Sequence, residues 1–514
     1  MSKRERMSAV DTAWLRMDRP TNLMQIAGIL VLETPLDLDR YRQTLEERLV
    51  QRFSRFRQRV EQDLTGAWWA DDPDFSIDNH LSLHRLSGGD AKTRLQQLTS
   101  RLAVQPLDPR HPLWHFDVVE DYQGGTAIVV RIHHCIADGI ALIGVMLSLT
   151  GSSATAPTPR PRGRHTDERD EARFWAPLLE PLTDPEKLAG YGRDGVGIVA
   201  ELLKLAALPK DSPTRFKGKA GRIKNIAWSE PIPLDEVKAV GKSMACSVND
   251  VLLAAVAGAM RRYLLTKGDS VDGVEIRAMV PVNMRSAADE DQLGNRFGLV
   301  TLLLPVFEAN PFARVFEVRR RMRELRNSYL PPVSLALLYA MGLVPQFLQN
   351  QALDLLAAKA SAVMTNVPGP SEPLYLAGAK LSQIMFWVPQ SGDIGMGVSI
   401  LSYAGMVQFG LITDHGMVPD PETIAPLFKH EFETMLLALL LGRWSEAVDP
   451  ASIEAEIWGE TRPIDTPIAA PIAPSIALRA KTPVTPKQAP GRGTKPPRAA
   501  PVRPVPKRFR GIAE

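Results

Sequence analysis

Two adjacent histidines precede an acidic residue and a glycine in RIHHCIADGIAL, residues 131–142. Because side chains alternate along a strand, one of His133 and His134 faces inward and the other faces the opposite side. A neutral imidazole accepts a proton near pH 7, so a histidine placed where a strand runs into a loop could act as a general base. Asp138 could hold the loop or the ring, and Gly139 permits close backbone approach where the next helix begins. The competing interpretation is a satisfied core histidine beside an exposed one.

Metal binding is a separate hypothesis for the histidines of this region. Neighbouring histidines at a strand end diverge, so they seldom chelate one ion. His111 and His115 flank Pro112, which weakens helical pairing between them. We therefore expect no metal site.

The elements around the histidines predict a mixed α/β fold, and the later part of the chain predicts a second one. Residues 22–33 and 126–134 have the apolar, branched composition of buried strands, and 139–150 continues as a helix. The second half repeats the pattern, with a strand ending at Pro281 and two strands around the turn at 403–405. The boundaries we expect are an N-terminal domain at 1–150, a linker with a helix at 151–225, a C-terminal domain at 226–460 and a disordered tail at 461–514.

Charge and cysteine content bear on the compartment and the partners. Of the 514 residues, the last 54 hold 11 Lys and Arg against 2 Asp and Glu, which leaves 50 against 56 for residues 1–460. Two cysteines without C-x-x-C spacing fit a reducing compartment, and the start lacks an apolar signal core, so we expect a cytoplasmic protein. The basic tail could attract anionic lipid through charge, and no specific nucleic-acid partner is expected.

An uncharged apolar stretch at residues 327–353 is the nearest approach to a membrane span. Pro331, Pro332 and Pro345 divide it, so we expect no transmembrane helix. It is predicted either to line a channel or lie on a membrane surface, or to be a plain core helix.

The full spacing HHxxxDG resembles the signature of the CoA-dependent acyltransferase superfamily, which includes chloramphenicol acetyltransferase and peptide-synthetase condensation domains. Further matches look like the bacterial wax ester synthase/diacylglycerol acyltransferase family over residues 8 to about 445. These matches are PTNLMQIAGILVLE near the start, PLD at 106–108 with HPLW at 111–114, SVNDV at 247–251, PVNMR at 281–285 with GN at 294–295, TNVPGP at 365–370 and ILSYAGMVQFGLITD late in the chain.

The resemblance implies two chloramphenicol-acetyltransferase-like mixed-sheet domains facing each other across a tunnel. It implies acyl transfer from a fatty acyl-CoA, as substrate, to diacylglycerol or a long-chain alcohol, without a metal or redox cofactor. His134 would deprotonate the acceptor hydroxyl for direct attack on the thioester, with His133, Asp138 and Gly139 in support and Asp138 more structural than chemical. Because such lipids partition into membranes, a peripheral position at the inner face of the membrane or at lipid droplets is also expected.

Two questions stay open at this point. Asn249 and Asp250 match a further family motif, but Asp250 lies three residues after Ser247, so it can equally serve as a helix cap. Two other functions also remain: a catalytically quiet lipid-binding or lipid-droplet protein of the same fold, and a condensation enzyme with a different acceptor. The intact HHxxxDG favours catalysis over mere binding.

Overall fold

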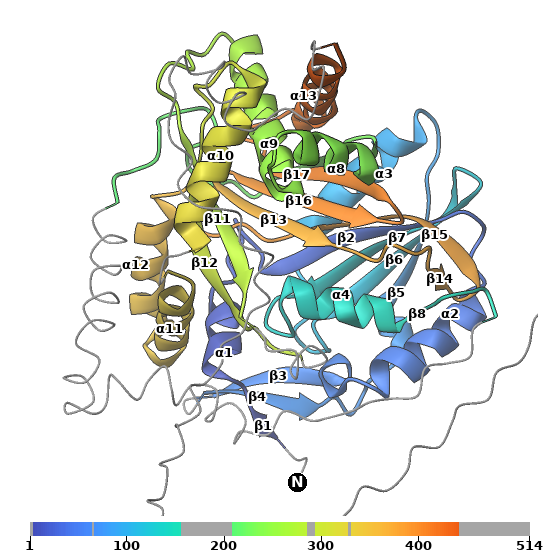
Figure 1. Cartoon of the computed structure of the whole chain (residues 1–514). Helices are drawn as coiled ribbons and strands as arrows, with labels where there is room; N and C mark the ends of the chain where they lie inside the picture. Colours follow the sequence, from blue (N-terminus) through green and yellow to red (C-terminus); the bar gives the residue numbers. More distant parts are fainter. Residues whose placement is uncertain (1–3, 64–65, 156–207, 285–292, 327–329, 442–514) are drawn as a thin grey trace, which may run out of the picture. The chain divides into compact units, whose positions relative to one another are not determined.

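The computed structural model describes residues 4–63, 66–155, 208–284, 293–326 and 330–441 (Figure 1). The predicted tail at 461–514 lies outside these ranges, as does nearly all of the predicted helical stretch of the linker. The domain boundaries therefore stay predictions.

The first large sheet holds the strand that carries the histidines. Its centre is β2 (Gln25–Leu32) against β7 (Gly125–His133), and every residue of both strands is buried. Continuous apolar character is what a strand covered on both faces requires. The strand order is β5 (Leu81–Arg85), β6 (Trp114–Tyr122), β7, β2, β15 (Ala379–Trp387), β14 (Tyr375–Leu376) and β8 (Thr150–Gly151). Two of these strands, β15 and β14, come from the second half of the chain.

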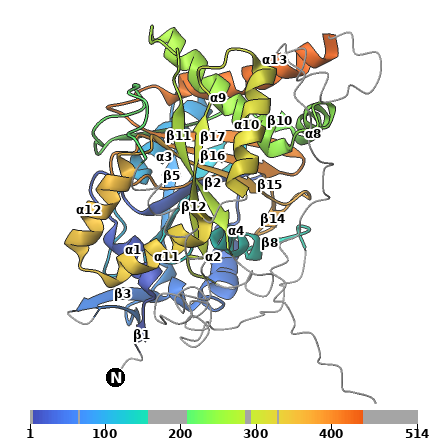
Figure 2. The ribbon, with the colours of Figure 1, turned by 60° about the vertical axis from the view of Figure 1, so that its left-hand side comes forward.

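The second large sheet is built from strands between residues 224 and 414. Its order is β10 (Ile232–Pro233), β17 (Met406–Asp414), β16 (Met396–Tyr403), β13 (Ala362–Pro368), β11 (Ile276–Asn283) and β12 (Phe297–Leu304), with β9 (Lys224–Trp228) paired to β17. The prediction that a strand ends at Pro281 is wrong, because β11 continues to Asn283. Beyond Met279 only β12 pairs with β11, so a residue without an N–H is tolerated there. Figure 2 brings this β11–β12 edge forward.

A third, small sheet and several short helices lie near the first sheet. The small sheet has the order β1 (Glu5–Arg6), β4 (Gly66–Asp71) and β3 (Gln58–Asp63). The helix α2 (Leu38–Leu45) begins after Asp37, whose side chain accepts backbone N–H bonds as its cap. A π-turn at Glu46–Val50 follows, with short 3₁₀ turns at Ser54–Phe56 and Ile77–His80.

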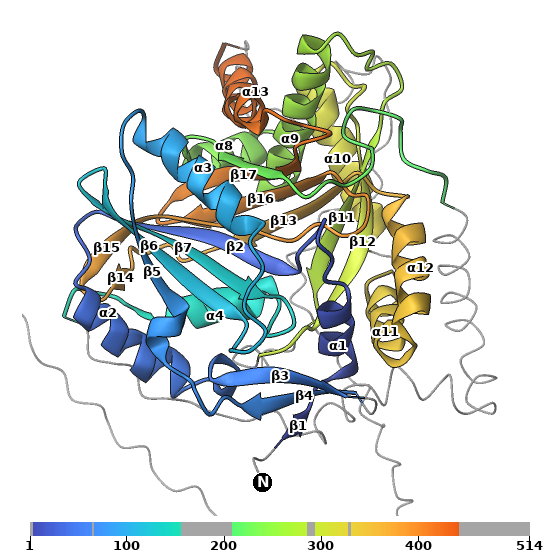
Figure 3. The ribbon, with the colours of Figure 1, turned by 180° about the vertical axis from the view of Figure 1, so that it is seen from behind.

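The longer helices fall into two groups. α8 (Leu234–Ser243), α9 (Val248–Thr266), α10 (Pro311–Arg326) and α13 (Pro421–Leu441) cover one face of the second sheet (Figure 1). α1 (Ala9–Arg16), α11 (Leu330–Leu343) and α12 (Gln346–Ala357) gather at the β12 edge, as the reverse view in Figure 3 also shows. α3 (Ala91–Ala103) packs on β9, and α4 (Gly139–Ser148) follows the histidine loop.

None of the helices in the described ranges is by itself long and apolar enough to cross a membrane. The pair α8–α9 passes that test only jointly and is bent by 100°. α9 is buried along most of its length against α10 and α13, which is the environment of a core helix.

Candidate active site

The end of β7 places the two histidines on different sides of the chain. The backbone N–H of His134 donates to the carbonyl of Met24 at 2.7 Å, and the His134 carbonyl accepts from Nδ2 of Asn295 at 2.9 Å. The His134 side chain lines a large cavity. His133 instead accepts the Cys135 N–H at its own Nδ1, 3.1 Å away, with its Nε2 3.8 Å from Oδ1 of Asp18. The predicted divergence of the two rings is confirmed.

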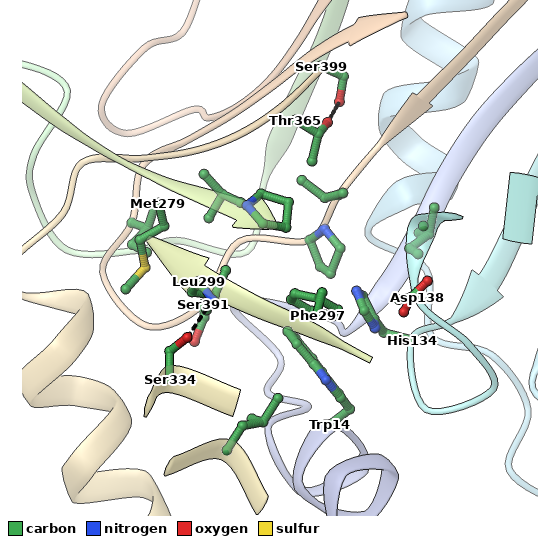
Figure 4. Close-up of a pocket in the computed structure, with 18 of the residues that line it drawn as sticks. Trp14, His134, Asp138, Met279, Phe297, Leu299, Ser334, Thr365, Ser391 and Ser399 are labelled. Carbon is green, nitrogen blue, oxygen red and sulfur yellow. Dashed lines mark hydrogen bonds between the residues drawn. The ribbon is translucent and has the colours of Figure 1, made fainter. Parts of the chain in front are cut away.

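The imidazole of His134 lies in a buried aromatic environment, shown in Figure 4. It is 4% exposed, it stacks on Trp14 with the ring centroids 4.0 Å apart and the planes 14° apart, and Phe297 lies 5.8 Å away. Its Nδ1 is buried and has no hydrogen-bond partner among the described residues. Burial lowers the pKa of His134 to about 4, which the nearby Asp138 carboxylate only partly opposes. The ring is therefore neutral at physiological pH.

Asp138 joins the histidine loop to the second half of the chain. Its Oδ1 accepts the N–H of Ala141 at 2.9 Å, which caps α4, and its Oδ2 accepts the N–H of Arg296 at 3.0 Å. Its own N–H donates to the carbonyl of Gly294 at 3.3 Å. Through these contacts Asp138 holds the histidine loop against residues 294–296, and its part in the reaction stays a prediction.

Gly139 opens α4 beside the cavity. A Cβ built at this position would meet no atom within 4 Å, and the residue lines the cavity wall. The glycine therefore leaves free space at the start of the helix rather than accommodating a close backbone contact.

Asn295 and Asp11 form a buried network that the sequence did not single out as part of the site. The Nδ2 group of Asn295 donates both to the His134 carbonyl and, at 2.7 Å, to Oδ1 of Asp11. Burial raises the pKa of Asp11 to about 6, against the effect of this hydrogen bond. Asp11 and Trp14 are three residues apart on α1, which places both on the side of the helix that faces His134. That spacing, and the GN pair at 294–295, were the available signals.

Asn249 and Asp250 lie at the start of α9, which contributes no residue to the wall of this cavity. Asp250 completes a capping box with Ser247, its Oδ2 accepting the Ser247 N–H at 2.9 Å. The Oδ1 of Asn249 accepts from Nδ2 of Asn366 at 2.8 Å, and of these residues Asn366 lines the cavity. The cap explains Asp250 structurally, and a direct part in chemistry stays a prediction for both residues.

The cavity is mostly apolar and is built by both halves of the chain. It encloses about 1780 Å³ of empty space, part of it open to solvent. Its walls come from α1, β2, α4, β11, β12, α11, α12, β13, β15 and β16. The apolar stretch that was predicted either to line a channel or to be a plain core helix forms α11 and α12, and it contributes Leu330, Ser334, Leu337, Leu338, Met341 and Leu353 to the wall.

The described residues contain no group of three or more His, Cys, Asp or Glu side chains placed to hold a metal ion. His111 pairs with Asp72 at 2.9 Å and His115 with Ser82 at 2.9 Å. Both contacts are local to the strand region around β6.

Comparison with known proteins identifies the family. The model of the wax ester synthase/diacylglycerol acyltransferase catalytic domain matches residues 7–252, and that of the WS/DGAT C-terminal domain matches residues 293–436. The chain belongs to the wax ester synthase/diacylglycerol acyltransferase family. As a member of this family, the chain is an acyltransferase.

Relatives of this family cover nearly the same span. The protein described as "Probable diacyglycerol O-acyltransferase tgs1" from Mycobacterium tuberculosis is 28% identical over 441 residues, which are 82% of this chain and 93% of that protein. The solved wax ester synthase/diacylglycerol acyltransferase from Marinobacter aquaeolei VT8 has a TM-score of 0.62 at 18% identity, covering 85% of this chain and 100% of that chain.

The fold extends to peptide-synthetase domains. The first condensation domain of the calcium-dependent antibiotic synthetase has a TM-score of 0.58 at 16% identity, covering 88% of this chain and 97% of that chain. The predicted fold class, two mixed-sheet α/β domains, is confirmed.

Proposed function

We propose that the chain transfers a long-chain acyl group from acyl-CoA to diacylglycerol, to a long-chain alcohol, or to both, forming triacylglycerol or wax ester. One observation carries the proposal: a neutral, buried histidine lies at the wall of an apolar cavity large enough for lipid substrates. The names of the family and of its relatives support the same chemistry.

His134 is the general base of the proposed reaction. As the acceptor hydroxyl oxygen attacks the thioester carbon, its proton passes to the neutral imidazole, and positioned proton transfer of this kind contributes roughly 10²- to 10⁴-fold. The tetrahedral intermediate then collapses, the C–S bond breaks, and the imidazolium returns the proton to the CoA thiolate. The acyl group is never bound to the protein. The reaction uses acyl-CoA as a substrate and needs no further cofactor.

Other motif residues support the base without touching the reacting atoms. Asp138 fixes the loop through the N–H groups of Ala141 and Arg296. His133 braces the same loop through the Cys135 N–H. Asn249 holds the cavity wall at β13 through Asn366, and Asp250 caps α9, the helix that carries Asn249.

Exposed apolar side chains on α11 and α12 support peripheral contact with a lipid surface. Leu343, Phe347 and Leu355 are 63%, 62% and 60% exposed on helices whose other side chains line the cavity. A membrane or lipid-droplet surface would cover these side chains and deliver the acceptor to the cavity. We place this contact on the cytoplasmic side, and it involves no specific nucleic acid.

The test is CoA thiol release from palmitoyl-CoA by the purified full chain, with dioleoylglycerol and then hexadecanol as acceptor. Release that requires an acceptor and is lost in His134→Ala supports direct transfer by a histidine base and identifies the lipid made. If neither acceptor gives release above the His134→Ala background, the proposal fails for these acceptors, and the quiet lipid-binding alternative is favoured. Transfer to an amine on a carrier protein would favour the condensation alternative instead.

A further inference from the structure

A second, smaller cavity lies beside the C-terminal half of α4. Its empty space is about 410 Å³, part of it open to solvent, against about 1780 Å³ for the main cavity, and its wall is apolar apart from Thr150 and backbone at Gly369. The side chains that define it come from the C-terminal half of α4 and from β14 and β15: Met146, Leu147, Leu149, Leu376, Leu381 and Ile384.

Three side chains line both cavities and so form the boundary between them. They are Ile143 on α4, Phe386 on β15 and Leu401 on β16. Phe386 lies opposite Gly28 in the β2–β15 register, and a Cβ at Gly28 would collide with the Phe386 ring. The glycine therefore lets the ring lie against β2.

α4 runs past both cavities in order. Its first residue, Gly139, and then Leu142 face the main cavity, Ile143 faces both, and Met146 and Leu149 face the second. Ten residue steps at about 1.5 Å give about 15 Å from Gly139 to Leu149. An extended hydrocarbon chain built of C–C bonds of about 1.5 Å advances roughly 1.25 Å per methylene, so this length holds about 12 methylenes.

We propose that the second cavity receives the methyl end of the acyl chain of the acyl-CoA donor, so that α4 sets the preferred chain length. This inference rests on the proposed function, because the thioester must lie at His134 for the chain to run along α4. The second cavity is much smaller than the main cavity and so holds at most one chain, whereas diacylglycerol carries two chains on a glycerol and needs the larger main cavity. The donor therefore occupies the second cavity, and its preferred acyl group has about 14 to 16 carbons by the length of α4.

Filling the second cavity tests the proposal. Met146 lies seven steps, about 10 Å, beyond Gly139, so Met146→Trp leaves room for about eight methylenes. With the acceptor fixed, we expect the preferred donor to change from palmitoyl-CoA to decanoyl-CoA or shorter. Since each buried methylene contributes roughly a fourfold factor, the palmitoyl-to-decanoyl ratio of kcat/KM falls on the order of 100-fold or more. Leu437→Trp, on an exposed part of α13, is the matched control and keeps the wild-type ratio.

Opening the boundary and varying the acceptor complete the experiment. Phe386→Ala removes part of the boundary between the cavities and should raise the palmitoyl-to-decanoyl ratio of kcat/KM. This variant tests the proposal if Met146→Trp is inactive with every donor. An unchanged donor ratio in the variant that remains active overturns the proposal. A shift in the preferred alcohol length with no shift in the donor also overturns it, because the second cavity would then hold the acceptor chain.

Binding separates this inference from the proposed function. Calorimetric titration of octanoyl-, decanoyl- and palmitoyl-CoA into the His134→Ala protein needs no turnover. Palmitoyl-CoA should bind more tightly than octanoyl- or decanoyl-CoA, and adding Met146→Trp should abolish the difference. If this holds while the wild-type protein shows no transfer to any acceptor, the cavity assignment stands and the proposed function fails. Equal affinity for all three donors would overturn the assignment even if transfer is observed.

Discussion

Removing the Asp138 carboxylate tests whether this residue positions the histidine loop or takes part in the chemistry. Asp138→Ala deletes the cap of α4, which costs about 1 kcal/mol. It also leaves the N–H of Arg296 without its carboxylate acceptor in a site where Asp138 is only 3% exposed, which costs about 1–3 kcal/mol more. We therefore expect the free energy of unfolding to fall by about 2–4 kcal/mol, measured by urea denaturation with fluorescence detection.

Asp138→Asn separates position from charge. Asparagine caps a helix nearly as well as aspartate and keeps one acceptor oxygen, so we expect it to recover about half of the lost stability and part of the lost kcat. Asp37→Ala removes the cap of α2, far from the cavity, and should cost about 1 kcal/mol without changing kcat/KM. If Asp138→Ala unfolds at the wild-type urea concentration yet loses activity as completely as His134→Ala, the positioning role is refuted and the carboxylate acts in the reaction itself.

Three further predictions follow from the buried groups around His134. Because burial lowers the pKa of His134 to about 4, kcat/KM should stay level from pH 8 to pH 6 and fall only below about pH 5. Trp14→Ala exposes the ring to water and should shift this acidic fall in kcat/KM to higher pH. A fall in the kcat/KM of the wild-type protein near pH 6.5 would contradict the burial argument. Asn295→Ala removes the hydrogen bond that holds the His134 carbonyl, so it should lower kcat at least ~10-fold with little change in the KM for acyl-CoA. An unchanged kcat would show that this hydrogen bond is dispensable. The raised pKa of Asp11 means that the folded state binds more protons than the unfolded state between about pH 4 and pH 6, so this group costs stability as pH rises through that window. Asp11→Asn should remove the dependence and gain up to ~3 kcal/mol at pH 8 in urea unfolding, and a loss of stability there would show that the carboxylate's hydrogen bonds outweigh its burial.

Local patterns in the sequence predicted those parts of the site that depend on neighbouring residues. The alternation along residues 126–134 is enough to separate His133 from His134, because adjacent side chains at a strand end diverge. The capping box at Ser247 and Asp250 was predicted in the same way, since both partners lie within one helical turn.

Contacts between distant residues could not be predicted in this way. The partners of the His134 carbonyl and of Asp138 lie 161 and 158 residues further along the chain, and Asn295 reaches back 284 residues to Asp11. The composition of β15 predicts a strand but not that it joins the first sheet, where it forms one boundary of the second cavity through Phe386. Such pairings depend on tertiary packing, which a single sequence does not specify.

The low pKa of His134 constrains how the proposed proton transfer proceeds. An imidazole with a pKa near 4 is too weak a base to generate a free alkoxide before attack. Negative charge forms on the thioester oxygen during the attack, however, and a pair of unit charges about 4 Å apart at an effective dielectric of about 20 gains about 4 kcal/mol. That gain corresponds to about 3 pKa units, which is comparable to the amount by which burial lowers the pKa of His134. The same buried environment that keeps the free imidazole neutral therefore raises its basicity once the oxyanion begins to form. Proton transfer and C–O bond formation should then be concerted.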